Sequence, residues 1–400
     1  MNILLLSTSD KGGAANACVR LHQGLLAIGE SSKMLVLKRT RAEEPEIHRF
    51  LTVYEPTSLF KKIKKAPRVI AFNRKRAKQT AGRPTNEMFS FFDTLHDITQ
   101  HPLYEWADVI NIHWVANFLD YPSFFSKNTK PVVWTLHDML LFTGGNHYEK
   151  NFPFAAYQDL IQSNLALKKK AFANQNFTIV CPSNWLHQAA KAQQGLYPKA
   201  QHRLIPYGLQ TEAFVPQDQA AARALFDIPV AQKIILFVAA SADSLRKGIN
   251  HLIDALPYLK NQNIGIAIMG SNVEKLNIDF PHIYPLGYIN DIHKIAAAYA
   301  AADVFVIPSI EDNLPNTVIE SLCCGTPVVG FDIGGIPDMV IPGKNGEICP
   351  TIAGKPLAET LQRALQTTYD TTWIRSNALE RYGLEVQAQT YKELFEELVN

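Results

Sequence analysis

Short runs of apolar residues alternate along the whole chain with longer segments of helical period. Apolar runs of four to eight residues between turn signals are typical of strands buried on both faces, and helices between them favour a parallel sheet. The chain is therefore predicted to be α/β, with two Rossmann-like doubly wound sheets. The predicted strands of the first sheet are 2–7, 33–39, 109–115, 131–137, 177–183 and 203–208, and those of the second are 233–240, 265–270, 283–288, 304–309 and 327–332.

A connector of little regular period separates the two series. It is the segment PYGLQTEAFVPQDQ, residues 206–219, which contains Pro and Gly. Such composition is typical of a domain boundary, and 400 residues suit two domains of ordinary size. We place the domains at 1–210 and 211–383, with a hinge between them. An amphipathic tail, 384–400, follows.

The second series contains the richest segment, which begins after the strand ADVFVIPS. The loop SIEDNLPN opens a predicted helix, with Pro315 in its first turn and Asp312 or Asn313 as its cap. Glu320 lies a little over two turns beyond Asp312. Two carboxylates beside a helix N-terminus fit a sugar joined to a ribose through phosphates, since acids accept from hydroxyls and the helix end favours anions. The alternative is that Asp312 only caps the helix and Glu320 is solvated.

Together with GTPVVGFDIGGIPDMV, this segment resembles the retaining nucleotide-sugar glycosyltransferases of family 4, in a branch with an acidic-Asn-Leu-Pro-Asn loop. The resemblance spans most of the chain and is most specific in the second half. It implies the glycosyltransferase-B fold, in which two domains face each other across a cleft. Residues 1–210 would then bind the acceptor, residues 211–383 the donor, and a helix in 384–400 would cross back to the first domain.

The same resemblance assigns roles in the acidic loop. It places Asp312 against the donor sugar and Glu320 against the ribose hydroxyls, with Asn313 and Leu314 in the donor-binding loop. The family has Glu where this chain has Asp312, so the neighbouring Glu311 is an alternative sugar contact.

Phosphate and base contacts are expected at two other strand ends. After KIILFVAA, Lys247 precedes a glycine, and Arg246 could replace an arginine that the family places earlier in this loop. A basic pair would neutralise the charge that builds on the leaving diphosphate; the alternative for Arg246 is a solvated loop charge. Tyr288 and Ile289 match the residues that hold the base through backbone atoms.

The first series of strands offers a glycine loop and two histidines. Gly12 and Gly13 follow the first strand, where backbone N–H groups favour an anion, although a tight turn explains them equally well. The resemblance places this loop beside the donor phosphates and the acceptor, so we expect Gly12 and Gly13 to bind the donor. The resemblance places His137, in WTLHDM, near the donor sugar, and we expect Asp138 to orient its ring. We expect His113, beside Trp114, to line the cleft or contact the acceptor.

Composition narrows the class of protein. The chain is 47% hydrophobic and 19% charged, with a net charge of +2, as in soluble globular proteins. No run is apolar enough to span a membrane, and the first residues predict a core strand rather than a leader, so we expect a cytoplasmic protein. Five cysteines lack metal-ligand spacing and are predicted to be buried thiols: Cys18, Cys181, Cys323, Cys324 and Cys349. We expect no metal site and no required cofactor.

One segment departs from this balance. Between Pro56 and Asn86 there are ten Lys or Arg and no acid. Apolar residues are interleaved with them: Phe60, Ile63, Val69, Ile70 and Phe72. The stretch Lys61 to Lys78 could contact an anionic membrane or a lipid-linked acceptor, which would make the protein peripheral at the inner membrane face. A solvated loop or an acidic polymer site are alternatives. We expect Pro67 to interrupt any long helix. We do not expect nucleic acid as a partner, because no base-stacking module accompanies the charges.

The sequence thus predicts a retaining glycosyltransferase that moves a sugar from a nucleoside diphosphate sugar to a hydroxyl of a glycan or lipid-linked saccharide, in cell-surface polysaccharide synthesis. A nucleotide-sugar epimerase or a phosphorolytic enzyme could use the same fold. The alternative from another class is a non-catalytic sugar-nucleotide sensor. The sequence leaves the base, sugar, acceptor, linkage and oligomeric state open.

Overall fold

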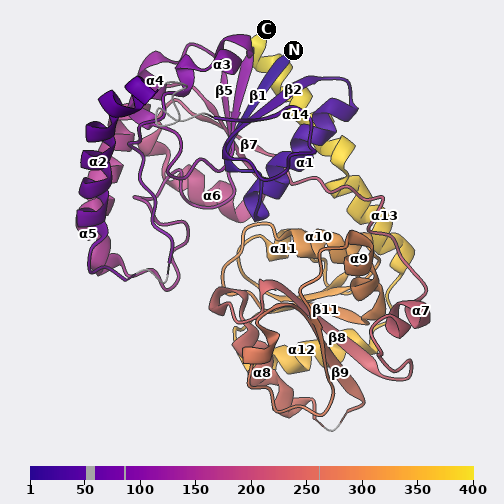
Figure 1. Ribbon diagram of the computed structural model, residues 1–400. Helices are drawn as coiled ribbons and strands as arrows, with labels where there is room; N and C mark the ends of the chain where they lie inside the picture. Colours follow the sequence, from indigo (N-terminus) through magenta and orange to yellow (C-terminus); the bar gives the residue numbers. More distant parts are fainter. Residues whose placement is uncertain (51–58, 85–86, 261) are drawn as a thin grey trace. The chain divides into compact units, whose positions relative to one another are not determined.

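The computed structural model describes residues 1–50, 59–84, 87–260 and 262–400, with side chains from Pro67 onward in the helix that begins at Leu59. The chain divides into two compact units (Figure 1). Unit 1 comprises Met1–Ile205 and Gln387–Asn400, and unit 2 comprises Pro206–Val386. These divisions lie within a few residues of the sequence boundaries at 210 and 383.

Unit 1 contains a seven-stranded sheet in the order β3-β2-β1-β4-β5-β6-β7, with every pairing parallel. The strands are β1 Asn2–Ser9, β2 Ser31–Lys38, β3 Ile47–Arg49, β4 Val109–Ile112, β5 Val132–Thr135, β6 Thr178–Cys181 and β7 Gln201–Leu204. The helices are α1 Gly13–Ala27, α2 Leu59–Thr80, α3 Pro102–Trp106, α4 Tyr121–Lys127, α5 Phe154–Phe172 and α6 Asn184–Ala192.

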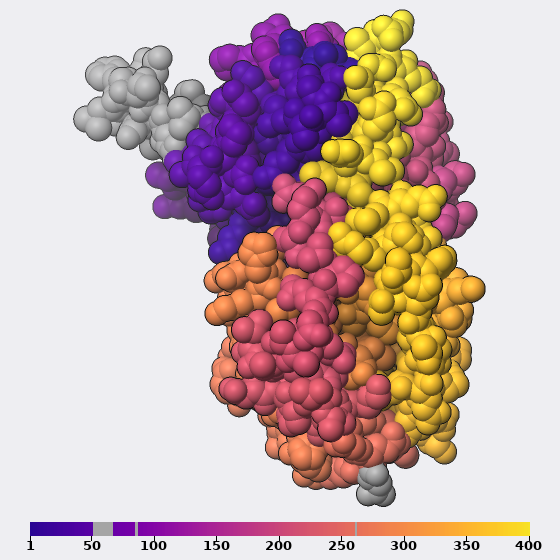
Figure 2. Space-filling model, turned by 90° about the vertical axis from the view of Figure 1, so that its right-hand side faces the viewer, coloured from indigo at the N-terminus to yellow at the C-terminus, as the bar shows by residue number. Residues whose placement is uncertain are grey.

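Alternate residues of the central strand β1 enter two separate cores, as the period of a strand requires. Leu4 and Leu6 belong to the core beneath α4, α5 and α6, whereas Ile3 and Leu5 pack with α1. The C-terminal helix α14, Leu384–Val399, completes the second core through Ala388, Tyr391, Leu394 and Phe395. Figure 2 shows this yellow helix against the indigo N-terminal segment. The last residues of the chain therefore pack on the first unit.

Unit 2 contains a six-stranded sheet in the order β10-β9-β8-β11-β12-β13, again with parallel pairings. The strands are β8 Lys233–Ser241, β9 Ile264–Ser271, β10 Ile283–Gly287, β11 Val304–Ile307, β12 Val328–Phe331 and β13 Gly346–Cys349. The helices are α7 Gln219–Ala224, α8 Ile249–Ala255, α9 Ile292–Ala301, α10 Asn316–Cys323, α11 Ile336–Met339, α12 Gly354–Gln366 and α13 Thr371–Tyr382. The predicted fold class, two Rossmann-like parallel-sheet domains, is confirmed.

One expectation about the basic segment is wrong. Helix α2 runs continuously from Leu59 to Thr80 with Pro67 inside it. An internal proline removes one backbone hydrogen bond and can bend a helix without ending it, especially where the proline is exposed, as Pro67 is. Phe60, Ile63 and the lysines from Lys61 to Lys65 lie outside the residues whose side chains are described.

Two further findings concern the class of protein. All five cysteines are buried and free, as predicted. Among the helices of the described residues, none combines the length and apolar character needed to cross a bilayer.

Candidate functional site

The candidate donor residues of unit 2 lie after the carboxyl ends of three strands, β8, β10 and β11, in the loops that follow them or, for Glu320, in helix α10. Because these strands are parallel, their carboxyl ends meet at one edge of the sheet, where open α/β sheets bind ligands. The sequence therefore predicted candidate residues that the fold brings to a common edge.

The loops after β8 and β11 are joined through backbone atoms. Arg246, in a short 3-10 turn, donates from Nη1 to the carbonyl of Glu311 at 2.9 Å, and its own carbonyl accepts from Ile310 N at 3.0 Å. Gly248 follows with φ of 74° and lies so close to Pro308 that a Cβ would stand 1.7 Å from the Pro308 oxygen. Arg246 is therefore fixed in the site rather than a solvated loop charge.

Lys247 and Asp312 form an ion pair at the centre of these loops. Lys247 Nζ lies 2.5 Å from Asp312 Oδ2, and Arg246 Nη1 lies 3.8 Å from the same oxygen. Ser309 donates to Oδ2 at 3.3 Å. Burial alone would raise the pKa of Asp312, but the charges of Lys247 and Arg246 and the hydrogen bonds to its carboxylate lower it below its ordinary value. Asp312 is therefore ionised at neutral pH and holds both cations in place.

The predicted helix cap is wrong. Helix α10 begins at Asn316 with Pro315 in the N-cap position, and no side chain caps it. Asp312 instead accepts from the adjacent Asn313 N at 3.2 Å and from Lys247. The four residues Asp312–Pro315 form a buried loop before the helix, because Asn313 and Leu314 are also buried. The acid that marks this loop thus serves the charge cluster, not the helix end.

Glu320, in α10, is held by an adjacent helix. The hydroxyl of Tyr299, which is fully buried in α9, donates to Glu320 Oε2 at 3.1 Å. The Tyr299 carbonyl accepts from Thr326 Oγ1 at 2.8 Å, so the loop between α10 and β12 also fixes Tyr299. Glu320 is partly exposed, which allows its carboxylate to meet solvent or a ligand.

The proposed base-binding residues lie after β10. Gly287 ends this strand with φ of 68°, and Tyr288 is 58% exposed. Ile289 is partly buried. This position at the carboxyl end of an edge strand leaves backbone atoms accessible, which suits recognition through the main chain.

In unit 1, the glycine loop after β1 is open on its outer side. A Cβ at Gly12 or Gly13 would meet nothing within 4 Å in the described residues. Gly12 has φ of 112°, a value that favours glycine, and it precedes the first residue of α1. The packing of unit 1 therefore does not require a glycine at Gly13. A ligand that approaches the backbone is one explanation for the glycine at this position.

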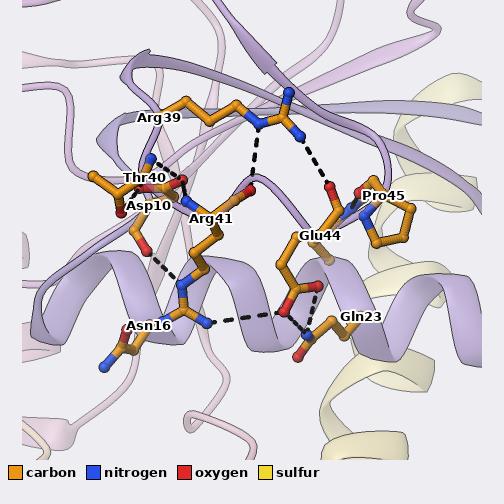
Figure 3. Close-up of polar contacts among 9 residues, drawn as sticks. Asp10, Asn16, Gln23, Arg39, Thr40, Arg41, Glu44 and Pro45 are labelled. Atoms are coloured by element: carbon orange, nitrogen blue, oxygen red, sulfur yellow. Dashed lines mark hydrogen bonds and ion pairs between the residues drawn. The ribbon is translucent and has the colours of Figure 1, made fainter.

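Asp10 anchors this loop, a role that the sequence analysis missed (Figure 3). The buried carboxylate accepts from Thr40 N at 2.7 Å and from Arg41 N at 2.8 Å. Arg41 donates in turn to the Asp10 carbonyl at 2.9 Å and to Asn16 Oδ1 at 2.6 Å. The loop after β2 thus holds the glycine loop from behind. Local sequence gives no signal for this contact, since thirty residues separate the partners.

His113 and His137, at the ends of β4 and β5, contact each other. His113 Nδ1 lies 2.9 Å from His137 Nε2, and His113 Nε2 lies 2.7 Å from Asn111 Oδ1. Both ring nitrogens of His113 are engaged inside the protein and the residue is buried, so of our two expectations the lining of the cleft, rather than direct contact with the acceptor, stays a prediction. Burial lowers the pKa of His137 to about 4, against a smaller opposing effect of the Asp138 charge.

Asp138 does not take the orienting role that we expected. The His137 ring is hydrogen-bonded to the His113 ring, whereas Asp138 Oδ2 lies 2.5 Å from His147 Nδ1 and accepts from Trp114 Nε1 at 2.9 Å. Burial would raise the pKa of Asp138, but His147 and these hydrogen bonds lower it. Asp138 therefore fixes the loop that follows His137.

A buried lysine holds the same loop. Lys168 Nζ, on α5, donates to the carbonyls of Leu141 at 2.9 Å and Thr143 at 2.8 Å, and also to that of Leu140. The ammonium lies 3.6 Å from the centre of the Phe92 ring. Burial lowers the pKa of Lys168 well below its ordinary value. No local pattern indicates this role, because Lys168 lies in a run of three lysines typical of a solvated helix face.

The basic helix α2 is only partly available for a partner. Arg76 pairs with Asp93 and lies 3.8 Å from the Phe91 ring centre, and Arg83, just beyond the end of the helix, makes two contacts of 2.8 Å with Asp159. Among the described side chains of α2, the exposed basic residues are Arg68, Arg74, Lys75 and Lys78. Lys75 also lies 3.6 Å from Asp93.

Comparison with known proteins shows which proteins the chain is similar to. Residues 232–367, which contain all of the donor loops described above, match the family model "Glycosyl transferases group 1". The site residues of unit 2 thus lie in a segment similar to this family.

Individual relatives are more distant. The D-inositol 3-phosphate glycosyltransferase of Mycobacteroides abscessus is 27% identical over 172 residues, 40% of this chain and 38% of the relative. A Bacillus subtilis protein named as the teichuronic acid biosynthesis glycosyltransferase TuaC is 25% identical over 274 residues, 67% of this chain and 64% of the relative. The chain therefore matches less than two thirds of the length of these relatives.

Solved structures share the fold over the whole chain. HepE of Anabaena, in complex with UDP, has a TM-score of 0.70 at 17% identity and covers 100% of both chains. Sucrose-phosphate synthase of Thermosynechococcus elongatus has a TM-score of 0.69 at 20% identity, covering 99% of this chain and 98% of that one. These likenesses confirm the two-domain fold of glycosyltransferases, and the sequence matches support the prediction of a glycosyltransferase enzyme.

Proposed function

We propose that the protein is a retaining glycosyltransferase that moves a sugar from a nucleoside diphosphate sugar to a hydroxyl of a glycan or lipid-linked saccharide. One observation carries the proposal. Within the segment that matches group 1 glycosyl transferases, two cations, Arg246 and Lys247, are held against Asp312 in loops at the carboxyl edge of a parallel sheet. Such a cluster suits a ligand that is anionic at its centre and carries hydroxyls at its ends.

In the proposed reaction, Arg246 and Lys247 stabilise the charge that develops on the departing diphosphate. Lys247 has three N–H donors, so it can keep its contact with Asp312 while it contacts a phosphate. Glu320, oriented by Tyr299, would accept hydrogen bonds from the ribose hydroxyls. Tyr288 and Ile289 would hold the base through their backbone. The attacking hydroxyl would approach the face from which the diphosphate leaves, which retains the anomeric configuration.

The sugar contact has two candidates in this site. Both Glu311 and Asp312 are buried, and the carboxylate of Asp312 already receives Lys247, Ser309 and the Asn313 amide. We therefore assign Asp312 to the orientation of Lys247 as well as to the donor sugar, with the neighbouring Glu311 as the alternative sugar contact. We also propose His137 as a contact of the donor sugar.

Two similar proteins and the charge of α2 bear on the acceptor. TuaC is named for teichuronic acid biosynthesis, and a structural neighbour is a lipopolysaccharide outer core galactosyltransferase, with a TM-score of 0.61 at 15% identity. Exposed basic residues on α2 would suit an anionic membrane or a lipid-linked acceptor. We propose cell-surface polysaccharide synthesis at the inner membrane face, as a peripheral protein.

The donor site is tested by calorimetric titration with UDP, GDP and ADP sugars. We expect Glu320→Ala to weaken binding of the preferred donor by about 1.5–3 kcal/mol, roughly 10- to 150-fold, the scale of a charge-assisted hydrogen bond. The matched control is Glu359→Ala, which removes an exposed helical glutamate from α12 of the same unit. Equal donor affinity in the two folded variants would remove Glu320 from the site.

Product analysis separates the transferase from its alternatives. Transfer to an acceptor with the α or β configuration of the donor preserved supports the proposal. A change in the donor sugar without any acceptor would indicate an epimerase. A strict requirement for phosphate would indicate a phosphorolytic enzyme. Donor binding without turnover across a broad acceptor panel would indicate a sensor.

A further inference from the structure

A continuous row of buried polar side chains leads from the C-terminal helix to His137, all within unit 1. The Tyr391 hydroxyl, in α14, lies 2.8 Å from Thr135 Oγ1. Asn111 Nδ2 donates to that oxygen at 3.0 Å, and the contacts through Asn111 Oδ1 and His113 then reach His137. Four of these residues, Asn111, His113, Thr135 and Tyr391, are less than 5% exposed. A polar row in a core of this kind needs complete hydrogen bonding to be stable.

The direction of each hydrogen bond follows from one fixed acceptor. Asn111 lies 3.1 Å from the Val133 carbonyl, which can only accept, so the amide nitrogen must face Val133 and the amide oxygen must face His113. His113 Nε2 therefore carries a hydrogen and donates to Asn111 Oδ1. In neutral His113, Nδ1 is then an acceptor.

The same logic fixes the next ring. Since His113 Nδ1 accepts, His137 Nε2 must be the donor in the 2.9 Å contact between them. Neutral His137 then carries its hydrogen on Nε2, and Nδ1 is the only nitrogen of the ring that can accept a hydrogen bond.

We propose that Asn111 is a positioning residue that, with Thr135 and Tyr391 behind it, fixes His113 and through it holds His137 as the Nε2–H tautomer. In the proposed function, His137 would thus present one defined tautomer to the donor sugar. This reading of the substrate contact rests on the proposed function, whereas the tautomer does not. It also gives the C-terminal helix a role at the site beyond packing.

Nitrogen NMR of the full chain with labelled histidine tests the tautomer directly, because a protonated and a bare ring nitrogen have well-separated chemical shifts. Loss of signals in His137→Asn and His113→Gln assigns the two rings. We expect His137 of the unaltered protein to show a protonated Nε2 and a bare Nδ1 at neutral pH. The opposite pattern would overturn the proposal, whatever the activity of the protein.

Two substitutions test the positioning role. Asn111→Leu removes the acceptor for His113, so we expect the tautomer of His137 to become mixed. The catalytic efficiency for the donor, kcat/KM, should fall about tenfold, which is the upper range for one neutral hydrogen bond. Tyr391→Phe removes one hydroxyl at the far end and should shift the ring signals of His113 and His137 with a smaller loss. It also serves if Asn111→Leu does not fold.

Tyr382→Phe is the matched control, because Tyr382 is 1% exposed and its hydroxyl has no hydrogen-bond partner among the described residues. Unchanged histidine signals in Tyr391→Phe and Asn111→Leu, like those of Tyr382→Phe, would overturn the proposal. Altered signals with no activity in any protein, including the unaltered chain, would instead count against the proposed function alone.

Discussion

Substitution of Gly334 tests how closely two donor loops approach each other. Gly334, in the loop after β12, has φ of 56°, and a Cβ there would lie 1.8 Å from the Asp312 carbonyl oxygen. The next residue, Gly335, donates from its backbone N to that same oxygen at 3.1 Å. Gly334→Ala must therefore push the loop that carries Asp312 away from the loop after β12.

The size of the effect follows from these distances. Ordinary contact begins at 3.4 Å, so the loops must separate by about 1.6 Å from the 1.8 Å position. We expect about 1 kcal/mol from the left-handed backbone, 1–3 kcal/mol from overpacking and about 1 kcal/mol from the weakened Gly335 hydrogen bond. The free energy of unfolding should thus fall by about 3–5 kcal/mol.

Gly343→Ala provides the control for backbone strain. Gly343 lies in the same unit with φ of 72°, but a Cβ there would meet nothing within 4 Å. It should cost only about 1 kcal/mol. Urea unfolding of both variants gives the difference, with hydrogen exchange of peptides from unit 2 to localise it. In folded protein, Gly334→Ala should also lower donor affinity at least tenfold, while Gly343→Ala should not. Equal destabilisation by the two variants would refute the argument from close approach.

Two other predictions concern unit 1. Gly13→Ala should leave the free energy of unfolding unchanged or raise it by about 0.5–1 kcal/mol, since no described atom opposes a Cβ there. If a ligand contacts this backbone, the substitution should reduce the turnover of the donor. Unchanged turnover would indicate that the glycine serves only the turn. His137 has a pKa of about 4, below its unfolded value of 6.5, so the unfolded chain binds the extra proton and stability is lost as pH falls from 6.5 to 4, by about 3 kcal/mol in urea titrations. His137→Asn should flatten that slope, and an equal slope in both proteins would contradict the assignment.

Much of the fold was predictable because the strands are short apolar runs. The two strands that the sequence analysis missed show little apolar pattern of their own. β3, with the sequence IHR, has one buried residue, and β13, with the sequence GEIC, has buried positions only at its two ends. Both lie at sheet edges, where a strand needs less apolar surface. The continuous helix through Pro67 was missed because the preference of proline for helix ends predicted a break, whereas a helix can tolerate the loss of a single backbone hydrogen bond.

The site was predictable as a set of residues but not as a set of contacts. Lys247, Asp312 and Glu320 were found because each follows a predicted strand or lies in a motif. Their partners were not predicted, because contacts such as Tyr299 with Glu320 or Lys168 with backbone carbonyls depend on how the helices pack. The spacing of residues along the chain does not indicate that packing. Asp138 shows the same limit, since the nearest residue in sequence is not the one that contacts the His137 ring.

In the proposed function, the Lys247–Asp312 pair bears on how a diphosphate site could stay ordered before its ligand binds. Arg246 and Lys247 are adjacent, and their like charges would favour separation of the two side chains unless a counter-charge lay between them and the sheet. Asp312 supplies that charge from a nearly buried position, with Lys247 at 2.5 Å and Arg246 at 3.8 Å. Because the ion pair is preformed, a phosphate that binds Lys247 meets a donor already in position, and less conformational entropy is lost on binding. The carboxylate also limits the attraction for anions in general, so the hydroxyl contacts at each end of the ligand are needed to select a nucleotide sugar over free phosphate.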